Sequence, residues 1–466
     1  MKSENEALKN AEQISTATES GNNTKERYTV IKRCLHTKAR VSTLKLNKGT
    51  VNLPCFMPVA TYGALKSANA NHEQIILCNT FHLRDLPFKE KNNSKEVKKG
   101  WKGCVSKFMN YNKPILTDSG GFQMITLRNA VSEDCVTFEL DDREGGKKDT
   151  NFFKHFIGEN SNISECEGPS DEQKSSENNQ KRRKLEEMVD NPENIRCQSN
   201  NKEIVELTPE RSIQIQHQLN SDIIMQLDDV VPPDSLRIED ACHRSVRWLD
   251  RCIIEHKRLG NENFLFPIIQ GGCSPELREY SVTNIMQRVN EHNLLGVAIG
   301  GLCGGEQKDA FFSTILENTN AIKRESKEGK IVPVYTMGIG YAVDILLSKA
   351  LGSDMSDCVY PTRTARFGKK LIDKSFECDC STCKYSDEYL KMLKGTTNHS
   401  MLITQHNLYF MRKFTERIRA AIIEDRFKEF IEQFFLKNYD NDKERWKFQW
   451  LRKVWGLLEI EYSFGF

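Results

Sequence analysis

The sequence predicts an α/β fold, and specifically a (β/α)8 TIM barrel. Three observations support this prediction: short apolar runs recur along the chain, longer amphipathic stretches separate them, and the runs end in Gly, Asp, Asn or Gln. Strands that are buried on both faces read as near-continuous apolar runs. Polar residues at the ends of many successive parallel strands are typical of a barrel with its active site at the C-terminal rim. A doubly wound sheet is the alternative, and it is disfavoured because no phosphate-binding GxGxxG follows the first run.

The predicted strands occur in chain order, and each leads into a polar residue or a glycine. Their ranges are 75–78 before Asn79, 115–117 before Asp118, 223–227 before Asp228, 265–269 before Gln270, 297–299 before Gly300, 334–337 before Gly338 and 355–356 before Asp357. Apolar residues recur at three- and four-residue steps over 235–258, 275–293 and 344–351, which predicts helices there. Alternation of strands and helices over roughly 300 residues predicts a mainly parallel sheet.

Composition indicates how the chain is divided. Residues 1–26 and 158–203 are polar and hold too few apolar side chains to offset the entropy of ordering, so we predict disorder in both. The basic run 181–184 is either a nuclear-import signal or a solvated charge run, and we favour the second. The predicted parts are a disordered N-terminal tail at 1–26, the N-terminal part of the barrel at 27–157, a low-complexity disordered insertion at 158–203, the C-terminal part of the barrel with the active site at 204–370, a cysteine-rich subdomain with helices at 371–440 and a C-terminal tail at 441–466.

Charge balance and cysteine content limit the class of protein. The 466 residues include 67 Lys and Arg against 65 Asp and Glu, so any nucleic-acid surface must be a local patch. No run of about 18 apolar residues occurs, which argues against a membrane-spanning protein. The 15 cysteines, in a chain without a secretory signal, indicate a reducing compartment in which thiols serve as metal ligands or stay unpaired. We therefore expect a cytoplasmic protein.

A cysteine cluster follows the predicted barrel. Cys378, Cys380 and Cys383 form a CxCxxC motif, and three thiolates this close suit a tetrahedral ion with sulfur ligands, which favours zinc. His406 lies 23 residues further on in an apolar helix pattern and is the predicted fourth ligand, with His399 as its competitor. A closed Cys3His site leaves no open position, so we expect one structural zinc ion per chain, held by an inserted zinc-binding subdomain. Three reduced thiols without a metal are the alternative.

Polar groups at the strand ends suggest a site for a flat, heterocyclic ligand. The motif Asp-Ser-Gly-Gly-Phe-Gln at 118–123 combines glycines that permit close backbone approach with an aromatic face. Carboxylate, amide and glycine groups follow later strands, at 228–229, 270–272 and 300–306. At one shared rim, such a set suits recognition of the edge of a nucleobase by paired donors and acceptors.

A further carboxylate stands close to two arginines. Asp357 ends a predicted strand, and Arg363 and Arg366 follow it within nine residues. This arrangement suggests a nucleophile next to a reader of phosphates or bases. Alternatively, Asp357 and Asp118 only cap turns at the ends of strands, where aspartate is common.

Several motifs, in the right order, resemble the queuine/guanine tRNA-ribosyltransferases from about residue 29 to residue 436. The motifs are Phe-Met-Pro-Val at 56–59, Asn-Thr-Phe-His-Leu at 79–83, the run 118–123, Tyr-Thr-Met-Gly-Ile-Gly at 335–340, Asp-Cys-Val-Tyr-Pro-Thr-Arg at 357–363 and the CxCxxC with His406. The resemblance implies a transglycosylase that exchanges guanine at the wobble position of tRNAs with a GUN anticodon for a 7-deazaguanine base. Such tRNAs are those for Asp, Asn, His and Tyr.

The resemblance also implies roles for individual residues. Asp357 would attack C1′ of the ribose to give a covalent ribosyl-enzyme, and Asp118 would be the general acid/base, as in retaining glycosyl transfer. Arg363 and Arg366 would read neighbouring uridines of the anticodon loop. The implied substrate-binding residues are Ser119, Phe122, Gln123, Asp228, Gln270, Gly301, Leu302, Tyr335 and Met337.

Two of these positions would hold the base between them. Tyr335 or Phe122 would stack on one face of the ring, and Met337 would cover the other face. The backbone of Gly301 and Leu302 would meet the edge of the base together with Asp228 and Gln270.

Details of the resemblance point to a eukaryotic catalytic subunit that uses queuine. Gly304 stands where bacterial members, which insert preQ1, carry a bulkier residue, so the glycine would leave room for the cyclopentenediol of queuine. Eukaryotic members pair this subunit with a homologous non-catalytic one, which typically lacks the nucleophile and the DSGG motif. Because both are present here, we expect the catalytic chain of a heterodimer. It would lie in the cytoplasm, with peripheral association at the outer mitochondrial membrane as a further location.

Other functions stay open at this point. The chain would be the non-catalytic accessory subunit if its site had decayed, or a bacterial-type enzyme if it took preQ1. A zinc-stapled barrel hydrolase of a small base or nucleoside would not need Arg363 and Arg366. The stretch 79–87 departs from the family's pattern after Leu83, which bears on the geometry of the rim and on partner contacts.

Overall fold

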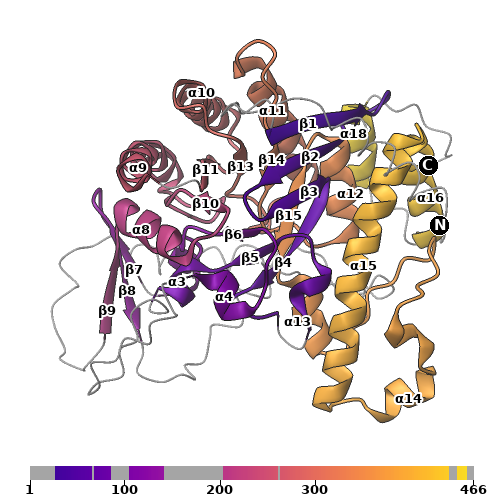
Figure 1. Cartoon of the computed structure of the whole chain (residues 1–466). Helices are drawn as coiled ribbons and strands as arrows, with labels where there is room; N and C mark the ends of the chain where they lie inside the picture. Colours follow the sequence, from indigo (N-terminus) through magenta and orange to yellow (C-terminus); the bar gives the residue numbers. More distant parts are fainter. Residues whose placement is uncertain are drawn as a thin grey trace, which may run out of the picture. The chain divides into compact units, whose positions relative to one another are not determined.

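A computed structural model of the chain describes residues 27–65, 68–84, 104–127, 129–140, 203–260, 263–439 and 449–458. These residues form two compact units. The larger unit comprises the described residues up to Gly121 and from Pro209 onward, and the smaller unit lies within 122–208. Figure 1 shows the ribbon of the whole chain. The predicted tail at 1–26 lies outside the described residues, as does the predicted insertion at 158–203 except for its last residue.

The larger unit contains a parallel sheet that closes on itself. Its strands are β4 (Cys55–Ala60), β5 (Ile76–Cys78), β6 (Ile115–Thr117), β10 (Ile223–Met225), β11 (Phe264–Phe266), β12 (Ile268–Ile269), β13 (Val297–Ile299), β14 (Val334–Thr336) and β15 (Met355–Cys358). The strand order is β11-β10-β6-β5-β4-β15-β14-β13-β12, and β4 pairs in parallel with both β5 and β15. The ends of this order, β11 and β12, are two halves of one run that Pro267 separates. The carbonyl of Phe266 accepts from Gln226 on one side, and that of Pro267 accepts from Ala298 on the other. The predicted barrel is confirmed, and the doubly wound alternative is excluded.

Helices connect successive strands and cover the outside of the barrel (Figure 1). They are the 3-10 turn η1 (Ala70–His72), α3 (Thr80–Leu83), α4 (Val105–Met109), α8 (Pro209–Leu219), α9 (Ile238–Leu259), α10 (Pro275–Glu291), α11 (Lys308–Glu325), α12 (Ala342–Ala350) and α13 (Tyr360–Arg366). Ser274 caps α10 by accepting from the amide of Leu277, and Pro275 begins that helix, where its missing N–H costs nothing. The three helices predicted from apolar periodicity therefore correspond to α9, α10 and α12.

An antiparallel sheet, which the sequence analysis did not predict, covers the amino-terminal end of the barrel. It consists of β1 (Tyr28–Arg33), β2 (Arg40–Leu46) and β3 (Gly49–Leu53). The carboxylate of Asp354, directly before β15, accepts from Arg40 Nε at 2.9 Å and from the amide of Val334 at 2.8 Å. The Tyr28 hydroxyl also donates to it, at 3.3 Å. This buried ion pair ties the sheet to the end of the barrel that faces away from the strands' carboxyl ends.

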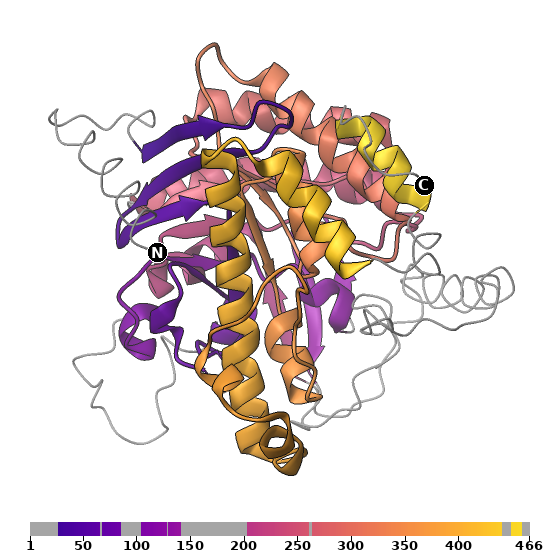
Figure 2. The same ribbon diagram turned by 90° about the vertical axis from the view of Figure 1, so that its right-hand side faces the viewer.

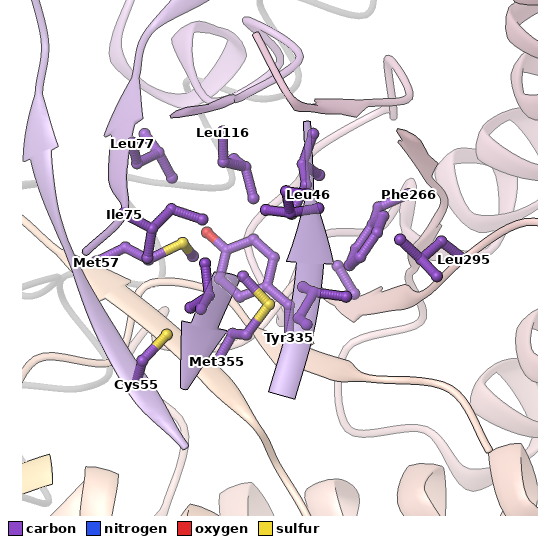
Figure 3. Packing of buried hydrophobic residues seen from close by; sticks show 14 of the residues in the cluster. Leu46, Cys55, Met57, Ile75, Leu77, Leu116, Phe266, Leu295, Tyr335 and Met355 are labelled. Carbon is purple, nitrogen blue, oxygen red and sulfur yellow. The ribbon is translucent and has the colours of Figure 1, made fainter. Parts of the chain in front are cut away.

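Apolar side chains fill the interior of the barrel. Met57, Ile75, Phe266 and Met355 are fully buried there, each from a different strand or strand approach. Tyr335 lies among them, as Figure 3 shows, and its ring has no exposed surface. The core therefore extends to the level at which β14 and β15 carry their polar residues.

A helical appendage follows the barrel. It consists of the 3-10 turn η3 (Ser381–Lys384), α14 (Asp387–Met392), α15 (Thr397–Ile423), α16 (Phe427–Asn438) and α18 (Gln449–Leu458). The long helix α15 lies lengthwise beside the barrel (Figure 2) and contacts α13 and β4. Residues 441–466 were predicted to be a C-terminal tail, but part of this segment forms the helix α18. Val454 and Trp455 of α18 are buried, and Trp450 stacks on Phe312 of α11. This contact is between residues far apart in the chain, so local composition did not indicate it.

The smaller unit is a three-stranded antiparallel sheet in the order β7-β8-β9, preceded by a short helix. These elements are α5 (Gln123–Thr126), β7 (Asn129–Val131), β8 (Val136–Leu140) and β9 (Glu203–Leu207). Val136 and Phe138 of β8 are buried within it. Across the described part of the chain, none of the helices combines the length and the apolar character that crossing a membrane requires.

Candidate active site and metal centre

The polar residues predicted at strand ends meet at one rim of the barrel. Asp118 follows β6, Asp228 lies three residues after β10, Gln270 follows β12 and Asp357 lies within β15. Because parallel strands in a closed barrel end at the same rim, these side chains share it. Two of the predicted substrate residues, Phe122 and Gln123, belong to the smaller unit and are placed only within that unit.

Asp357 is held by two donors from β14 and the loop that follows it. The Tyr335 hydroxyl donates to Asp357 Oδ1 at 2.5 Å, and the amide of Gly338 donates to the same oxygen at 2.9 Å. Gly338 has φ +77°, a conformation that glycine adopts without strain. Burial raises the pKa of Asp357, and the two donors oppose that rise because they stabilise the ionised carboxylate.

Asp118 is held by the segment that follows β5. Its carboxylate accepts from Asn79 Nδ2 at 2.8 Å, from the amide of Thr80 at 3.0 Å and from the amide of Gly120 at 3.2 Å. The Thr80 hydroxyl also donates to the Asp118 carbonyl. Asn79 accepts from the amide of His82 with its other side-chain atom and so caps α3. The unusual stretch 79–87 therefore keeps, in its described part, the residues that hold Asp118.

The charge of Asp357 influences the ionisation of Asp118. Burial raises the pKa of Asp118 to about 7, the donors around it oppose the rise, and the negative charge of Asp357 adds to it. The pKa of Tyr335 is also raised, by burial, by Asp357 and to a smaller extent by Asp118. These three groups thus lie in one electrostatic environment. A carboxyl group that titrates near neutral pH can give up and take back a proton during a reaction, as a general acid/base must.

A second group of side chains forms an array of donors and acceptors. Gln270 Nε2 donates to Asp228 Oδ2 at 2.6 Å, and the Ser119 hydroxyl donates to Asp228 Oδ1 at 3.1 Å. Burial raises the pKa of Asp228 to about 6, so the carboxylate is mainly ionised at neutral pH. Gly301 has φ +64°, and a Cβ there would lie 2.2 Å from Gln270 Oε1. The glycine therefore lets the backbone approach the Gln270 amide closely.

Two buried arginine side chains hold the loops that carry this array. Arg278 of α10 donates to the carbonyls of Ile269, Gly272 and Gly300 at 3.0, 2.7 and 2.8 Å, so it joins the loops that follow β12 and β13. Arg244 of α9 donates to the fully buried Asp229 at 2.6 Å. The sequence analysis missed both arginines because each reads as a solvated residue on an amphipathic helix.

The loop after β13 is shaped by a carboxylate that sequence reasoning did not single out. Glu306 accepts from the amides of Cys303 and Gly304 at 2.6 and 2.8 Å. It is the only acidic residue in the run 300–306, which is the signal that was available. A Cβ at Gly304 would lie 2.3 Å from the ring of Pro233, so the space beside this glycine is already occupied. The close approach of Pro233 is therefore one packing reason for a glycine at this position, and the expected room for queuine beside Gly304 stays a prediction.

Tyr335, one of the two residues predicted to stack on the base, does not lie where it could contact a ligand. The Tyr335 ring is fully buried in the barrel core and its hydroxyl serves Asp357, so it offers no face to a ligand. The prediction that Tyr335 stacks on a base is therefore wrong for this structure. Met337 is half-buried, and its sulfur lies 3.5 Å from where a Cβ on Gly300 would be, at the same rim.

The two predicted RNA-reading arginines lie on α13, directly after Asp357. Arg366 is exposed and Arg363 is half-buried. Burial and the positive charge of Arg366 both lower the pKa of Arg363, so the two guanidinium groups are close to each other. The short helix therefore presents two positive charges within one turn of each other.

The cysteine cluster forms a compact set of metal ligands. One ligand atom from each of Cys378, Cys380, Cys383 and His406 lies within 4.8 Å of the others. His406 Nδ1 lies 3.6, 3.3 and 3.3 Å from the three sulfur atoms in that order, and Nε2 lies 2.8 Å from the carbonyl of Leu371. The carbonyl requires the proton on Nε2, so Nδ1 points its lone pair at the thiols, as metal-binding histidines do. His399, the predicted competitor, lies instead against Gly368.

Known proteins match this chain over most of its length. A family profile described as queuine tRNA-ribosyltransferase matches residues 34–149 and 176–440. A protein named queuine tRNA-ribosyltransferase catalytic subunit from Schizosaccharomyces pombe is 35% identical over 465 residues, covering 92% of this chain and 96% of that protein. One of the same name from Caenorhabditis elegans is 33% identical, with 91% and 97% covered. A bacterial queuine tRNA-ribosyltransferase, from Psychrobacter cryohalolentis, is 33% identical, with 86% and 94% covered.

We expect elemental analysis of the purified chain to find one metal ion per molecule, and Cys380→Ser to lose it. A tetrahedral site that lacks one of its four ligands binds the ion far more weakly. Cys252→Ser is the matched control, because Cys252 is a buried thiol on α9 outside the cluster. A wild-type chain without a stoichiometric metal ion, or equal loss in both variants, would contradict the assignment.

Proposed function

The chain belongs to the queuine tRNA-ribosyltransferase family, and on that basis we propose which of its residues exchange the base. The enzyme is a transglycosylase that replaces guanine in tRNA with queuine. The observation that supports the assignment of residues is the pair Asp118, half-buried, and Asp357, buried, which lie at one rim where the charge of Asp357 helps raise the pKa of Asp118. Two carboxylates with separate environments are what a double displacement at a sugar carbon needs.

We assign Asp357 as the nucleophile. Tyr335 and Gly338 both donate to Oδ1, which fixes the carboxylate and directs Oδ2 toward the sugar. Oδ2 attacks C1′ of the ribose, the bond from C1′ to N9 of guanine breaks, and the bonding electrons leave with guanine. The product of this half-reaction is a ribosyl ester of Asp357 and free guanine.

We assign Asp118 as the general acid/base. With a pKa of about 7, a large fraction of it is protonated at neutral pH, so it can donate the proton that the departing guanine takes up. It is then a carboxylate and accepts the N9 proton of queuine as that nitrogen attacks C1′. The ester bond to Asp357 breaks, Asp357 regains its charge, and no water is consumed.

The donor and acceptor array next to these residues would bind the edge of the base. Asp228, ionised at neutral pH, accepts hydrogen bonds of the kind that a ring N–H and an exocyclic amine of a guanine-like base offer. Gln270 and the backbone of Gly301 and Leu302 lie beside it and add a side-chain amide and main-chain groups. Ser119 completes the array, and Met337 is the candidate for contact with one face of the ring.

We propose that the RNA is recognised at the wobble position of GUN anticodons through α13. Arg363 and Arg366 stand within nine residues of Asp357, so they can reach nucleotides next to the one whose ribose is attacked. Guanidinium groups bind bases and phosphates of an opened loop by paired hydrogen bonds and by stacking.

We propose that zinc is the ion of the Cys3His cluster. Three thiolates and one imidazole are the donor set that zinc prefers, and four protein ligands leave no position for a substrate. The ion would hold η3 and the loop before it against α15, and it would take no part in the chemistry. Thiolate ligands and a tRNA substrate both fit a cytoplasmic location.

We further propose that this is the catalytic chain of a heterodimer with a homologous subunit. Relatives from Schizosaccharomyces pombe and Caenorhabditis elegans are named catalytic subunits, which supports a second chain. The accessory-subunit alternative is disfavoured because both rim carboxylates are in place. A hydrolase of a small nucleoside would consume water and release free ribose, whereas base exchange consumes no water and keeps the ribose in the RNA.

Asp357→Asn is expected to abolish incorporation of labelled queuine into unmodified tRNA, by more than about 10³-fold, because an amide is a poor nucleophile. It is also expected to abolish the covalent enzyme–RNA adduct seen on denaturing gels. Asp250→Asn, on α9 and paired with Arg288, is the matched control and keeps both signals. An adduct that persists in Asp357→Asn would remove this residue from its role.

Tyr335→Phe is expected to move the acidic limb of the pH profile of kcat/KM to higher pH. The hydroxyl stabilises ionised Asp357, so its removal raises the pKa of that carboxyl and protonates the nucleophile at a higher pH. Tyr28→Phe is the matched control, since Tyr28 is also buried and donates to an aspartate, but at the other end of the barrel. An unchanged limb in Tyr335→Phe, or equal shifts in both variants, would contradict the assignment.

Arg363→Ala is expected to raise KM about tenfold for tRNAs with a GUN anticodon, which is the usual cost of one lost base-reading contact. Binding of tRNAs with other anticodons should change little. Arg324→Ala, on α11 and bonded to exposed glutamates, is the matched control. If Arg363→Ala weakened binding of all tRNAs equally, Arg363 would be a phosphate contact.

A further inference from the structure

Asn407 links the metal centre to the helix that carries the two arginines. It follows the metal ligand His406 on α15, and its side chain is fully buried. Its Nδ2 donates to the carbonyls of Pro361 and Lys369 at 2.9 and 3.0 Å, and its Oδ1 accepts from the amide of Leu371 at 2.9 Å. One side chain thus satisfies one main-chain group in the first turn of α13 and two in the segment that follows the helix.

His406 and Asn407 hold the same peptide unit from neighbouring positions. The Leu371 carbonyl accepts from His406 Nε2 at 2.8 Å, while the Leu371 amide donates to Asn407 Oδ1. The other ring nitrogen of His406 faces the three thiols. A continuous path of hydrogen bonds therefore runs from the metal ligands, through Leu371 and Asn407, to Pro361 in the first turn of α13.

The helix α13 depends on such outside support. It has only seven residues, and a helix of that length is unstable without tertiary contacts. Arg363 and Arg366 lie between the two points, Pro361 and Lys369, at which Asn407 holds the segment. Asp357 does not depend on these bonds, because Tyr335 and Gly338 fix it from β14 and the loop after it.

We propose that Asn407 is a positioning residue for RNA recognition, through which the metal centre sets the placement of Arg363 and Arg366. This inference rests on the proposed function of those two arginines. The metal centre then does more than stabilise the appendage, because its ligand helix fixes the reading helix. The chemical step would not depend on Asn407, because Asp357 is held by Tyr335 and Gly338.

A purely structural role would give a different result. If Asn407 only satisfied buried polar groups, its loss would lower stability and the amount of folded enzyme, without a selective effect on RNA binding. A positioning role predicts a higher KM for tRNA with a nearly unchanged kcat. It also predicts faster amide exchange within 360–371 while the metal ion stays bound.

The experiment compares Asn407→Ala with Asn438→Ala. Asn438 of α16 is a matched control, because it is equally buried, accepts from the amide of Lys374 at 2.9 Å and donates to Asp373 at 2.8 Å. It thus braces the same connecting segment a few residues further on, without touching α13. Metal content, thermal unfolding, amide exchange by mass spectrometry and steady-state kinetics with a GUN tRNA are measured for each.

We expect Asn407→Ala to keep one metal ion per chain, to raise KM for tRNA about tenfold, the equivalent of one lost hydrogen-bonded contact, and to change kcat less than about threefold. Amides at 360–371 should exchange faster than in the wild type. Asn438→Ala should lose comparable thermal stability and show neither effect. Unchanged KM in Asn407→Ala, an equal rise in both variants, or loss of the metal ion from Asn407→Ala would each overturn the proposal.

A second variant, with a side chain of the same shape as asparagine, covers the case in which Asn407→Ala does not fold. Asn407→Asp keeps the acceptor for the Leu371 amide and loses the two donors to Pro361 and Lys369. A KM equal to that of the wild type would show that these donors have no role in positioning and would overturn the proposal. Arg363→Ala is measured alongside to separate the proposed role of Arg363 from that of Asn407. An unchanged KM in Arg363→Ala would refute the role of the arginine itself.

Discussion

The proposed chemistry of this barrel depends on the cost of shielding two ionisable carboxylates from water at one rim of the barrel, at the ends of β6 and β15. Burial favours the neutral form of each, and main-chain and side-chain donors recover part of the lost hydration. The balance differs between the two sites. Asp118 is left with a pKa of about 7 and a negatively charged neighbour, whereas Asp357 receives a short bond from the Tyr335 hydroxyl. This difference in environment supports the two roles proposed above, acid/base for Asp118 and nucleophile for Asp357, because two carboxyl groups that share a site take separate roles when their pKa values differ.

The two ends of the barrel differ in how their buried aspartates are used. Those at the amino-terminal end stabilise the fold, and those at the carboxyl-terminal end form the candidate site. At the amino-terminal end, Asp354 accepts from an arginine, a tyrosine and a main-chain amide, and these bonds hold the N-terminal sheet against the barrel. At the carboxyl-terminal end, compensation is incomplete, and the pKa values of Asp118, Asp228 and Asp357 are all raised. The buried arginine Arg278 stabilises the loops at that end through carbonyl oxygens, and so it holds the rim without neutralising the carboxylates.

The sequence was sufficient for features that are local or periodic. Buried strands were recognisable as apolar runs, the polar residues after them marked the rim, and CxCxxC marked the metal centre. Features that depend on closure of the barrel were not recognisable. Tyr335 reads as a core or stacking residue, because its acceptor lies 22 positions further on and meets it only when β14 pairs with β15. Gly304 and Pro233 are far apart in the chain, so the packing reason for that glycine could not be seen. The N-terminal sheet went unnoticed because its short strands alternate between buried and exposed residues without a distinctive motif.

The proposed metal centre lies beside α13, the helix proposed to read the RNA, and the short length of α13 gives a reason for this arrangement. Asp357, the proposed nucleophile, belongs to a barrel strand that pairs with its neighbours, whereas Arg363 and Arg366 stand on a seven-residue helix that follows the strand. Rigid placement of that helix must come from α15, which reaches it with consecutive residues: His406 faces the thiols and Asn407 faces α13. His406 and Asn407 are consecutive residues of one hydrogen-bonded helix. Fixing the backbone at His406 therefore also fixes the backbone, and so the side-chain position, of Asn407. The contacts of α15 with the cysteine cluster and with the proposed RNA-reading helix thus come from two consecutive residues.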